Sequence, residues 1–249
     1  MRIGTWNVEY AAGADKNLLR RAVLQEHDCD VWVLTETHDE LVPSAAHEPI
    51  HSDQRRTGRP GGRWASIWTR YPVQQRLEVV DPRRTVAALV QAPTGPLIVF
   101  GTVMPWGSDR GDAEPGTPVR AWSELHRVVL QQGQEWAVLQ RQHPAADLCV
   151  AGDLNMNLGG RHYSGSALGR RLLREAMAVC ALFCATETEC VPAGKLANPP
   201  IDHVLLPVAW KPRAKVVAAW EGKTGSDPRL SDHSGLVVEV DLTAGPSPS

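Results

Sequence analysis

The stretch Val-Ala-Gly-Asp-Leu-Asn-Met-Asn at residues 150–157 joins a short apolar run to alternating polar side chains. Residues 148–151 predict a buried strand that ends at Gly152. Side chains two residues apart in extended chain point the same way, so Asp153 and Asn155 would present a carboxylate and an amide together. In α/β folds, ligands gather at such strand ends. The alternative is a simple turn, because Gly, Asp and Asn are common turn formers.

Polar residues also stand at or just beyond the ends of other predicted strands. These residues are Asn7, Glu36, Asp202, Asp232 and His233. Like charges repel and carboxylates are expensive to bury, so convergence of the acids would require a cation. Oxygen ligands with one imidazole favour a hard metal such as Mg²⁺ or Mn²⁺. Each residue alone has an ordinary structural explanation, whereas their combination favours a metal site.

The rest of the chain predicts an α/β fold built in layers. A strand at residues 2–8, a helix at 15–26 and a strand at 30–36 follow one another, as in a layered α/β unit. Strands at 85–90 and 97–103 flank a Pro-Thr-Gly-Pro turn, which predicts an antiparallel hairpin and therefore a mixed sheet. The other expected elements are strands at 64–70, 201–207, 215–220 and 235–242, helices at 119–142 and 166–182, and a loop at 37–62.

Composition limits the class of protein. The 249 residues are 43% hydrophobic and 22% charged, which predicts one globular domain over residues 1–242 and a flexible Gly/Pro/Ser-rich tail at 243–249. A net charge of −2 argues against binding of nucleic acid by bulk charge, so any such contact would need a local patch. The most basic run is Arg55, Arg56, Arg59 and Arg63, which we interpret as a solvated loop.

No apolar run is long enough for a membrane span, and no signal peptide is recognised, so we expect a cytoplasmic protein. We also expect a monomer. The five cysteines are odd in number and suit a reducing compartment. Cys180, Cys184 and Cys190 match no usual zinc-ligand spacing, so we expect them to pack in the core.

In order and spacing, several short segments resemble the endonuclease/exonuclease/phosphatase family. They are Thr5-Trp6-Asn7, Leu34-Thr35-Glu36-Thr37, Ala65-Ser66-Ile67-Trp68-Thr69-Arg70, Gly152-Asp153-Leu154-Asn155, Ile201-Asp202-His203 and Ser231-Asp232-His233-Ser234. The resemblance covers nearly the full chain. It implies a four-layer α/β/β/α sandwich with two stacked mixed sheets, and hydrolysis of a phosphate ester with one or two Mg²⁺ or Mn²⁺ ions.

The resemblance also implies a role for each motif residue. Glu36 would be the principal metal ligand, supported by Asn7 and Asp232 directly or through water. If a second ion binds, its candidate ligands are Asp153, Asn155 and His233.

The remaining roles concern water and phosphate. Asp153 would activate or position the attacking water, and Asn155 would hold water and a phosphate oxygen. His233 would contact the phosphate, and Asp202 would fix its imidazole ring.

One segment departs from the family pattern. Many members place a Tyr or His that touches the phosphate after the strand that here ends near Phe100, but this chain has Met104-Pro105-Trp106. Arg63 or His126 could supply the missing donor. Trp64, Trp68, Trp122 and Trp136 are expected in the core, whereas Trp106 would lie beside the site.

We therefore expect a metal-dependent hydrolase of a phosphodiester, with DNA and RNA among its candidate substrates, acting as an endo- or exonuclease. A small-molecule or lipid phosphodiesterase is one alternative. A non-catalytic binding scaffold of the same fold is the other, motivated by the missing Tyr or His.

Overall fold

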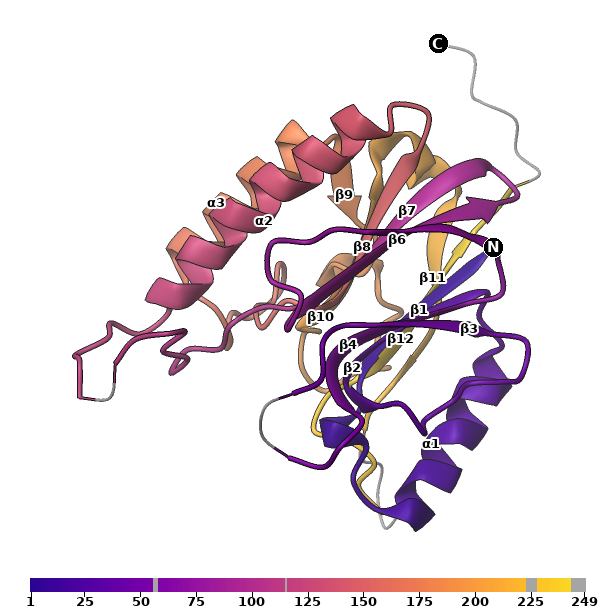
Figure 1. The fold of residues 1–249 in the computed structure, drawn as a ribbon, viewed down its shortest axis with the longest axis horizontal. Helices are drawn as coiled ribbons and strands as arrows, with labels where there is room; N and C mark the ends of the chain where they lie inside the picture. Colours follow the sequence, from indigo (N-terminus) through magenta and orange to yellow (C-terminus); the bar gives the residue numbers. More distant parts are fainter. Residues whose placement is uncertain (56–57, 115, 223–227, 243–249) are drawn as a thin grey trace.

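The computed structural model describes residues 1–249 except 56–57, 115, 223–227 and 243–249. Two six-stranded sheets are stacked on each other (Figure 1), with strand orders β11-β12-β1-β2-β4-β3 in sheet A and β5-β6-β7-β8-β10-β9 in sheet B. Sheet A contains β1 (Arg2–Asn7), β2 (Val31–His38), β3 (Glu48–His51), β4 (Gly62–Thr69), β11 (Ala214–Trp220) and β12 (Gly235–Val240). Sheet B contains β5 (Val73–Leu77), β6 (Thr85–Ala92), β7 (Gly95–Val103), β8 (Asp147–Asp153), β9 (Leu182–Cys184) and β10 (Asp202–Pro207).

Helices cover the two outer faces of this pair of sheets (Figure 1). The helix α1 (Ala14–His27) packs on sheet A, while α2 (Ser123–Gln142) and α3 (Ala167–Val179) pack on sheet B. Short 3₁₀ turns η1 (Glu9–Ala11), η2 (Thr188–Cys190) and η3 (Val208–Arg213) lie in the connections. The expected four-layer α/β/β/α sandwich with mixed sheets is confirmed, because β1–β2 and β7–β8 are parallel and their neighbours antiparallel.

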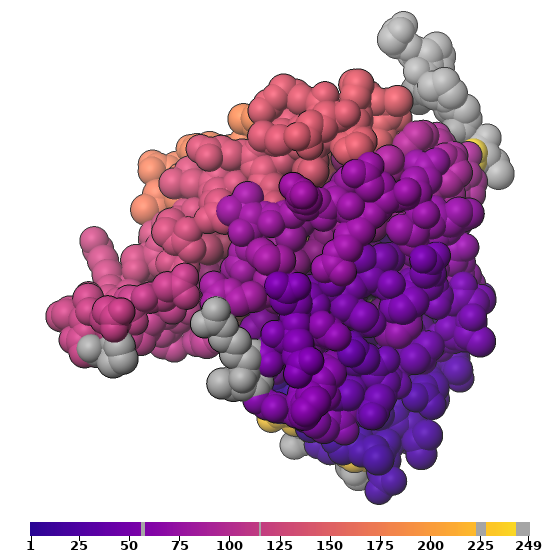
Figure 2. All heavy atoms as spheres, viewed as in Figure 1, coloured from indigo at the N-terminus to yellow at the C-terminus, as the bar shows by residue number. Residues whose placement is uncertain are grey.

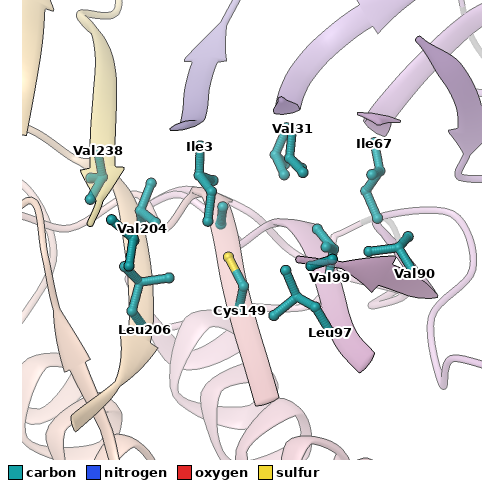
Figure 3. Packing of buried hydrophobic residues seen from close by; sticks show 14 of the residues in the cluster. Ile3, Val31, Ile67, Val90, Leu97, Val99, Cys149, Val204, Leu206 and Val238 are labelled. Atoms are coloured by element: carbon teal, nitrogen blue, oxygen red, sulfur yellow. The ribbon is translucent and has the colours of Figure 1, made fainter. Parts of the chain in front are cut away.

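The main core lies between the sheets. Figure 3 shows Ile3, Val31 and Ile67 of sheet A pointing toward Val99 and Cys149 of sheet B. Side chains alternate along a strand, so the residues that lie between these in the sequence point to the other face of sheet A, where α1 covers them. Burial on both faces explains why the central strands have continuous apolar runs rather than an alternating pattern.

Three strands were not expected from the sequence, and all of them are short strands at or near a sheet edge. They are β3, inside the predicted loop at 37–62, together with β5 and β9. In β5, only Val73 and Leu77 are even partly sheltered from solvent, so the strand has too few buried side chains to give a hydrophobic pattern. Edge strands are often short and polar because this discourages pairing with other chains.

Two predicted helices have different ends in the structure. α2 begins at Ser123 rather than at residue 119, because Trp122 has a left-handed backbone (φ 67°) that a helix cannot include. α3 ends at Val179, since Ala181 is also left-handed (φ 51°) and turns the chain into β9.

The connection from β7 to α2 projects from the body of the molecule (Figure 2). The tail predicted to be flexible at 243–249 lies outside the described residues, as does Arg56. None of the described helices combines the length and apolar composition that crossing a bilayer requires.

The topology brings several strand ends to one end of the sandwich. β1 and β2 run in the same direction, and β12 runs antiparallel to β1, so it starts where β1 ends. In sheet B, β10 pairs antiparallel with β8 so that Asp202 lies opposite Asp153. On its other side β8 pairs with β7, where Gly152 lies opposite Thr102: the φ of Gly152 is +135°, and an added Cβ would lie 2.0 Å from the Thr102 carbonyl oxygen.

We predict that Gly152→Ala destabilises the protein by about 2–4 kcal/mol, because it combines backbone strain with a clash against backbone. The matched control is Gly95→Ala, which has a similar φ of +117° but no atom within 4 Å of its added Cβ. Urea unfolding followed by tryptophan fluorescence measures both losses. Equal losses for the two variants would contradict the close approach of β7 and β8.

Candidate active site

Five polar side chains from both sheets converge at this end of the sandwich. Asn7 ends β1, Glu36 lies near the end of β2, and His233 precedes β12 in sheet A. Asp153 ends β8 and Asp202 begins β10 in sheet B. The hydrogen bond from Asn7 Nδ2 to Asp153 Oδ2, 3.1 Å long, joins the two groups across the core.

Asp153, Asp202 and His233 form the centre of the site. His233 Nδ1 lies 2.6 Å from Asp202 Oδ2, and His233 Nε2 lies 3.9 Å from Asp153 Oδ2. Both aspartates are only 1% exposed. Burial disfavours the charged imidazole, but the Asp202 and Asp153 carboxylates outweigh it and raise the pKa of His233 to about 10. His233 is therefore a cation at neutral pH that partly offsets the two buried carboxylates.

Two amide side chains bridge the carboxylates. Asn7 Nδ2 donates to Glu36 Oε1 (3.2 Å) as well as to Asp153, and Asn7 Oδ1 accepts from the Glu9 amide (3.0 Å). Asn155 donates from its backbone amide to Asp153 Oδ1 (2.8 Å) and from Nδ2 to Asp153 Oδ2 (3.2 Å). In this arrangement the Asn7 amide nitrogen faces the carboxylates, and its side-chain oxygen faces the Glu9 backbone amide.

Glu36 occupies an irregular position in β2. Its neighbours pair with β4, but Glu36 itself is skipped in the register and has a left-handed backbone (φ 46°). Burial raises the pKa of Glu36, opposed by the Asn7 hydrogen bond, by the charge of His233 and by a hydrogen bond from Tyr10. The backbone irregularity turns this carboxylate toward Asn7 and the centre of the site.

The structure does not bring Asp232 into the same group. Its side chain is 52% exposed, and its Oδ2 lies 3.6 Å from Arg229 Nη2. Of the metal ligands predicted from the sequence, Glu36 and Asn7 are therefore together, while the Asp232 carboxylate faces a surface arginine.

The two suggested replacement donors are occupied elsewhere. Arg63 donates from Nε and Nη2 to the two carboxylate oxygens of Asp39, both at 2.8 Å. His126 Nε2 lies 2.6 Å from Ser166 Oγ at the start of α3. Neither side chain contacts the central residues in these interactions.

Two residues of the site were missed in the sequence. Ser231 Oγ donates to the Asn7 carbonyl (2.6 Å) and accepts from the His233 amide (3.0 Å), so it fastens the His233 loop to β1. Its position in the Ser-Asp-His segment was a usable signal. Tyr10 hydrogen-bonds Glu36 from a left-handed 3₁₀ turn (φ 62°), which has no signature in residue type.

The donor set fits a hard divalent cation. Asp153 and Asp202 are buried and Glu36 is partly buried, against the single positive charge of His233. Asp202 Oδ1 is also buried without a hydrogen-bond partner. Excess buried negative charge with a free carboxylate oxygen is what a bound Mg²⁺ or Mn²⁺ would neutralise.

The described residues hold no other cluster of three or more His, Cys, Asp or Glu side chains with this spacing. Cys180, Cys184 and Cys190 therefore form no zinc site in this part of the chain. Cys180 and Cys184 are buried as expected, but the expectation was wrong for Cys190, which is exposed.

A sequence profile described as the Endonuclease/Exonuclease/phosphatase family matches residues 4–233. Comparison with curated proteins gives no significant match.

Three solved structures illustrate the likeness in fold. A 3′ phosphatase from Neisseria bound to a product DNA hairpin has a TM-score of 0.67 and 17% identity, covering 97% of this chain and 100% of that one. An AP endonuclease from Archaeoglobus fulgidus has a TM-score of 0.63 and 15% identity, with 97% and 100% covered. The human Nocturnin catalytic domain with bound sulfate has a TM-score of 0.64 and 15% identity, with 96% and 92% covered.

We predict that Asp202→Asn lowers the pKa of His233 by roughly 1 to 3, because it removes a carboxylate charge in direct contact with the ring. The control is Asp232→Asn, whose half-exposed carboxylate contributes least among the acids that act on His233. Imidazole ¹H–¹⁵N NMR titration of metal-free protein measures both. A larger effect from Asp232→Asn would show that the Asp202–His233 contact does not set the charge of the ring.

Proposed function

Because the chain belongs to the endonuclease/exonuclease/phosphatase family, we propose that it is a divalent-metal-dependent phosphoesterase that hydrolyses a phosphodiester of DNA or RNA. The observation that carries the proposal is the cluster of Asp153, Asp202 and His233, whose ligand atoms lie within 4.8 Å of one another. Asn7 and Glu36 adjoin this cluster and complete an oxygen-rich site.

A first Mg²⁺ or Mn²⁺ ion would be held by Glu36 with Asn7, and Asp232, which lies apart from them, would contribute through water. Such an ion withdraws charge from the phosphoryl and leaving oxygens. For Asn7 to contribute its oxygen, the amide would have to turn, because Nδ2 now faces the carboxylates. A second ion would draw on Asp153 and Asn155, and on His233 Nε2 only if the imidazole first lost its proton to the solvent, because a protonated ring has no lone pair for a metal.

The chain's own residues would position water and phosphate. Burial raises the pKa of Asp153, which makes this carboxylate a stronger base toward an attacking water. The charged His233 would donate from Nε2 to a phosphate oxygen, since its Nδ1 is engaged by Asp202. Asn155, already bonded to Asp153 and to the Met104 carbonyl, would hold the water in line.

The charge arrangement argues against a purely structural scaffold. A scaffold would gain nothing from two buried aspartates, one with an unpaired oxygen, because burying carboxylates destabilises a fold. The neighbours in fold include an AP endonuclease and a phosphatase bound to a DNA hairpin, which supports a nucleic-acid substrate over a lipid or small phosphodiester.

We predict that the purified protein cleaves a fluorescently labelled oligonucleotide with Mg²⁺ or Mn²⁺ and not in EDTA. Asp153→Asn and His233→Gln should each lower kcat by roughly 10²- to 10⁴-fold, because each removes a proton-transfer or charge-stabilising group. Arg171→Ala is the control, since this side chain is exposed on α3. Cleavage that survives in EDTA, or in both site variants, would rule out the proposed reaction.

We also predict that Glu36→Gln weakens Mn²⁺ binding by at least about 10- to 100-fold. Loss of a residue that only supports a metal ligand has an effect of this size, and Glu36 is proposed to be a ligand itself. Isothermal titration calorimetry of the chelator-treated protein measures the affinity without turnover. Asp232→Asn should weaken binding less, because its carboxylate is half exposed and faces Arg229. The reverse ranking would make Asp232 the principal ligand and contradict the role given to Glu36.

A further inference from the structure

Aromatic rings and arginine side chains interleave beside the candidate active site. We call Tyr10, Arg55, Trp64, Arg84 and Trp106 the aromatic–arginine patch. The Arg55 guanidinium carbon lies 4.2 Å from the Tyr10 ring centroid and 4.1 Å from that of Trp64. The Arg84 guanidinium carbon lies 5.5 Å from the rings of both Trp64 and Trp106, whose centroids are 6.1 Å apart. The five side chains therefore form one continuous cluster, in which Tyr10 and Trp106 are exposed and the other three are partly buried.

This patch adjoins the central residues at two points. At one end, Tyr10 hydrogen-bonds Glu36. At the other end, Trp106 follows Met104, whose carbonyl oxygen accepts a 2.8 Å hydrogen bond from Asn155 Nδ2. A substrate whose phosphate lies between Glu36 and Asn155 would have its neighbouring group against the patch.

The exposure of aromatic side chains is concentrated at this place. Most tryptophans are sheltered, and Trp6, Trp32, Trp136 and Trp210 are almost completely buried. Among the described residues, the largely exposed aromatic side chains are Tyr10 (47%), Trp106 (38%) and Tyr163 (47%). Tyr163 also adjoins the site, since the charges of Asp202 and Asp153 act on its hydroxyl. Exposed aromatic faces gathered at a polar site mark a binding surface rather than core packing.

The two arginines of the patch differ in their partners. Arg84 Nη1 lies 2.6 Å from Asp109 Oδ2, so the carboxylate compensates its charge. Within the described part of the chain, Arg55 has no carboxylate at ion-pair distance, and its Nε is buried without a hydrogen-bond partner. The charge of Arg55 acts on Glu36 and on the Tyr10 hydroxyl, so the patch brings a positive charge to the edge of the acidic centre.

We propose that the aromatic–arginine patch stacks an unpaired nucleobase next to the scissile phosphate. The inference rests on the proposed function and narrows its substrate to a nucleic-acid strand with a free base. Aromatic and guanidinium planes both stack on bases, and every base offers a π face, so the contact needs no particular sequence. A base inside a duplex has both faces covered by its stacked neighbours and its edge held by pairing, so the base that enters the patch must have left the duplex or belong to a single strand.

The charge of the patch also separates this substrate from a lipid. A choline-type headgroup would seek aromatic faces, but Arg55 already occupies the space between Tyr10 and Trp64 and repels a second cation. The same charge attracts the phosphates that flank a nucleobase.

The first test compares two single-stranded oligonucleotides that differ at one position beside the cleaved phosphate. One strand has a base there, and the other has an abasic tetrahydrofuran unit. The wild-type protein should favour the strand with the base by roughly 5- to 100-fold in kcat/KM. Trp106→Ala should bring this ratio close to one, and Trp106→Phe should keep most of it. Leu130→Ala, a truncation of another exposed apolar side chain on α2, is the control and should leave the ratio as in wild type.

A binding measurement keeps the inference independent of turnover. In the Asp153→Asn background, a strand carrying 2-aminopurine at the same position should lose fluorescence on binding, and Trp106→Ala should abolish this quenching. Oligonucleotide cleavage without distinction between base and abasic unit would overturn the stacking role while leaving the proposed function standing. Quenching in the Asp153→Asn background, together with no hydrolysis of the strand by the wild-type protein, would support the patch and overturn the proposed function. Preferential hydrolysis of sphingomyelin vesicles would overturn the nucleobase assignment.

Discussion

The hydrogen bond from Asn7 to Asp153 spans the boundary between the two sheets, and the candidate site depends on that junction. Neither sheet carries the site alone, because Asn7 and Glu36 belong to sheet A, and His233 to the segment that leads into it, whereas Asp153 and Asp202 belong to sheet B. The apolar core between the sheets therefore does more than stabilise the fold. By fixing how the sheets stack, it sets the distances between carboxylates that would otherwise repel one another.

Several backbone conformations that cost free energy lie at the same junction. Tyr10, Glu36 and Asn155 all have left-handed backbones, each of which costs a non-glycine residue roughly 1–2 kcal/mol. Asp202 adds a buried oxygen without a partner. These costs are tolerated because three layers of apolar packing surround the site, and they orient side chains that a regular strand would direct to the wrong face. In the proposed reaction, the bound cation would recover part of this cost.

The sequence predicted elements that are strongly buried. It did not predict features whose position depends on neighbouring parts of the fold. Central strands and the acids at their ends were predicted, because two covered faces impose long apolar runs that stop where Asp153 and Glu36 begin the polar site. Edge strands such as β5 bury too little to leave a pattern. Trp64 was expected in the core and is only partly buried, since it lies near the start of β4 beside Arg55. The exposure of Asp232 depends on the course of its loop, which residue types do not encode.

A protein with a net negative charge repels the phosphates of a nucleic acid, and this repulsion must be offset for the two to bind. The net charge of −2 and the cluster of Asp153 and Asp202 both repel phosphates, so a long-range positive field cannot supply affinity. For the proposed substrate, the charges that would offset this repulsion are local: His233 within the cluster, and Arg55 beside it. Stacking on aromatic faces does not depend on net charge, and it acts only at short range. A site that combines a compensated acidic centre with an aromatic surface would therefore recognise a strand by contact at one nucleotide rather than by attraction along its length.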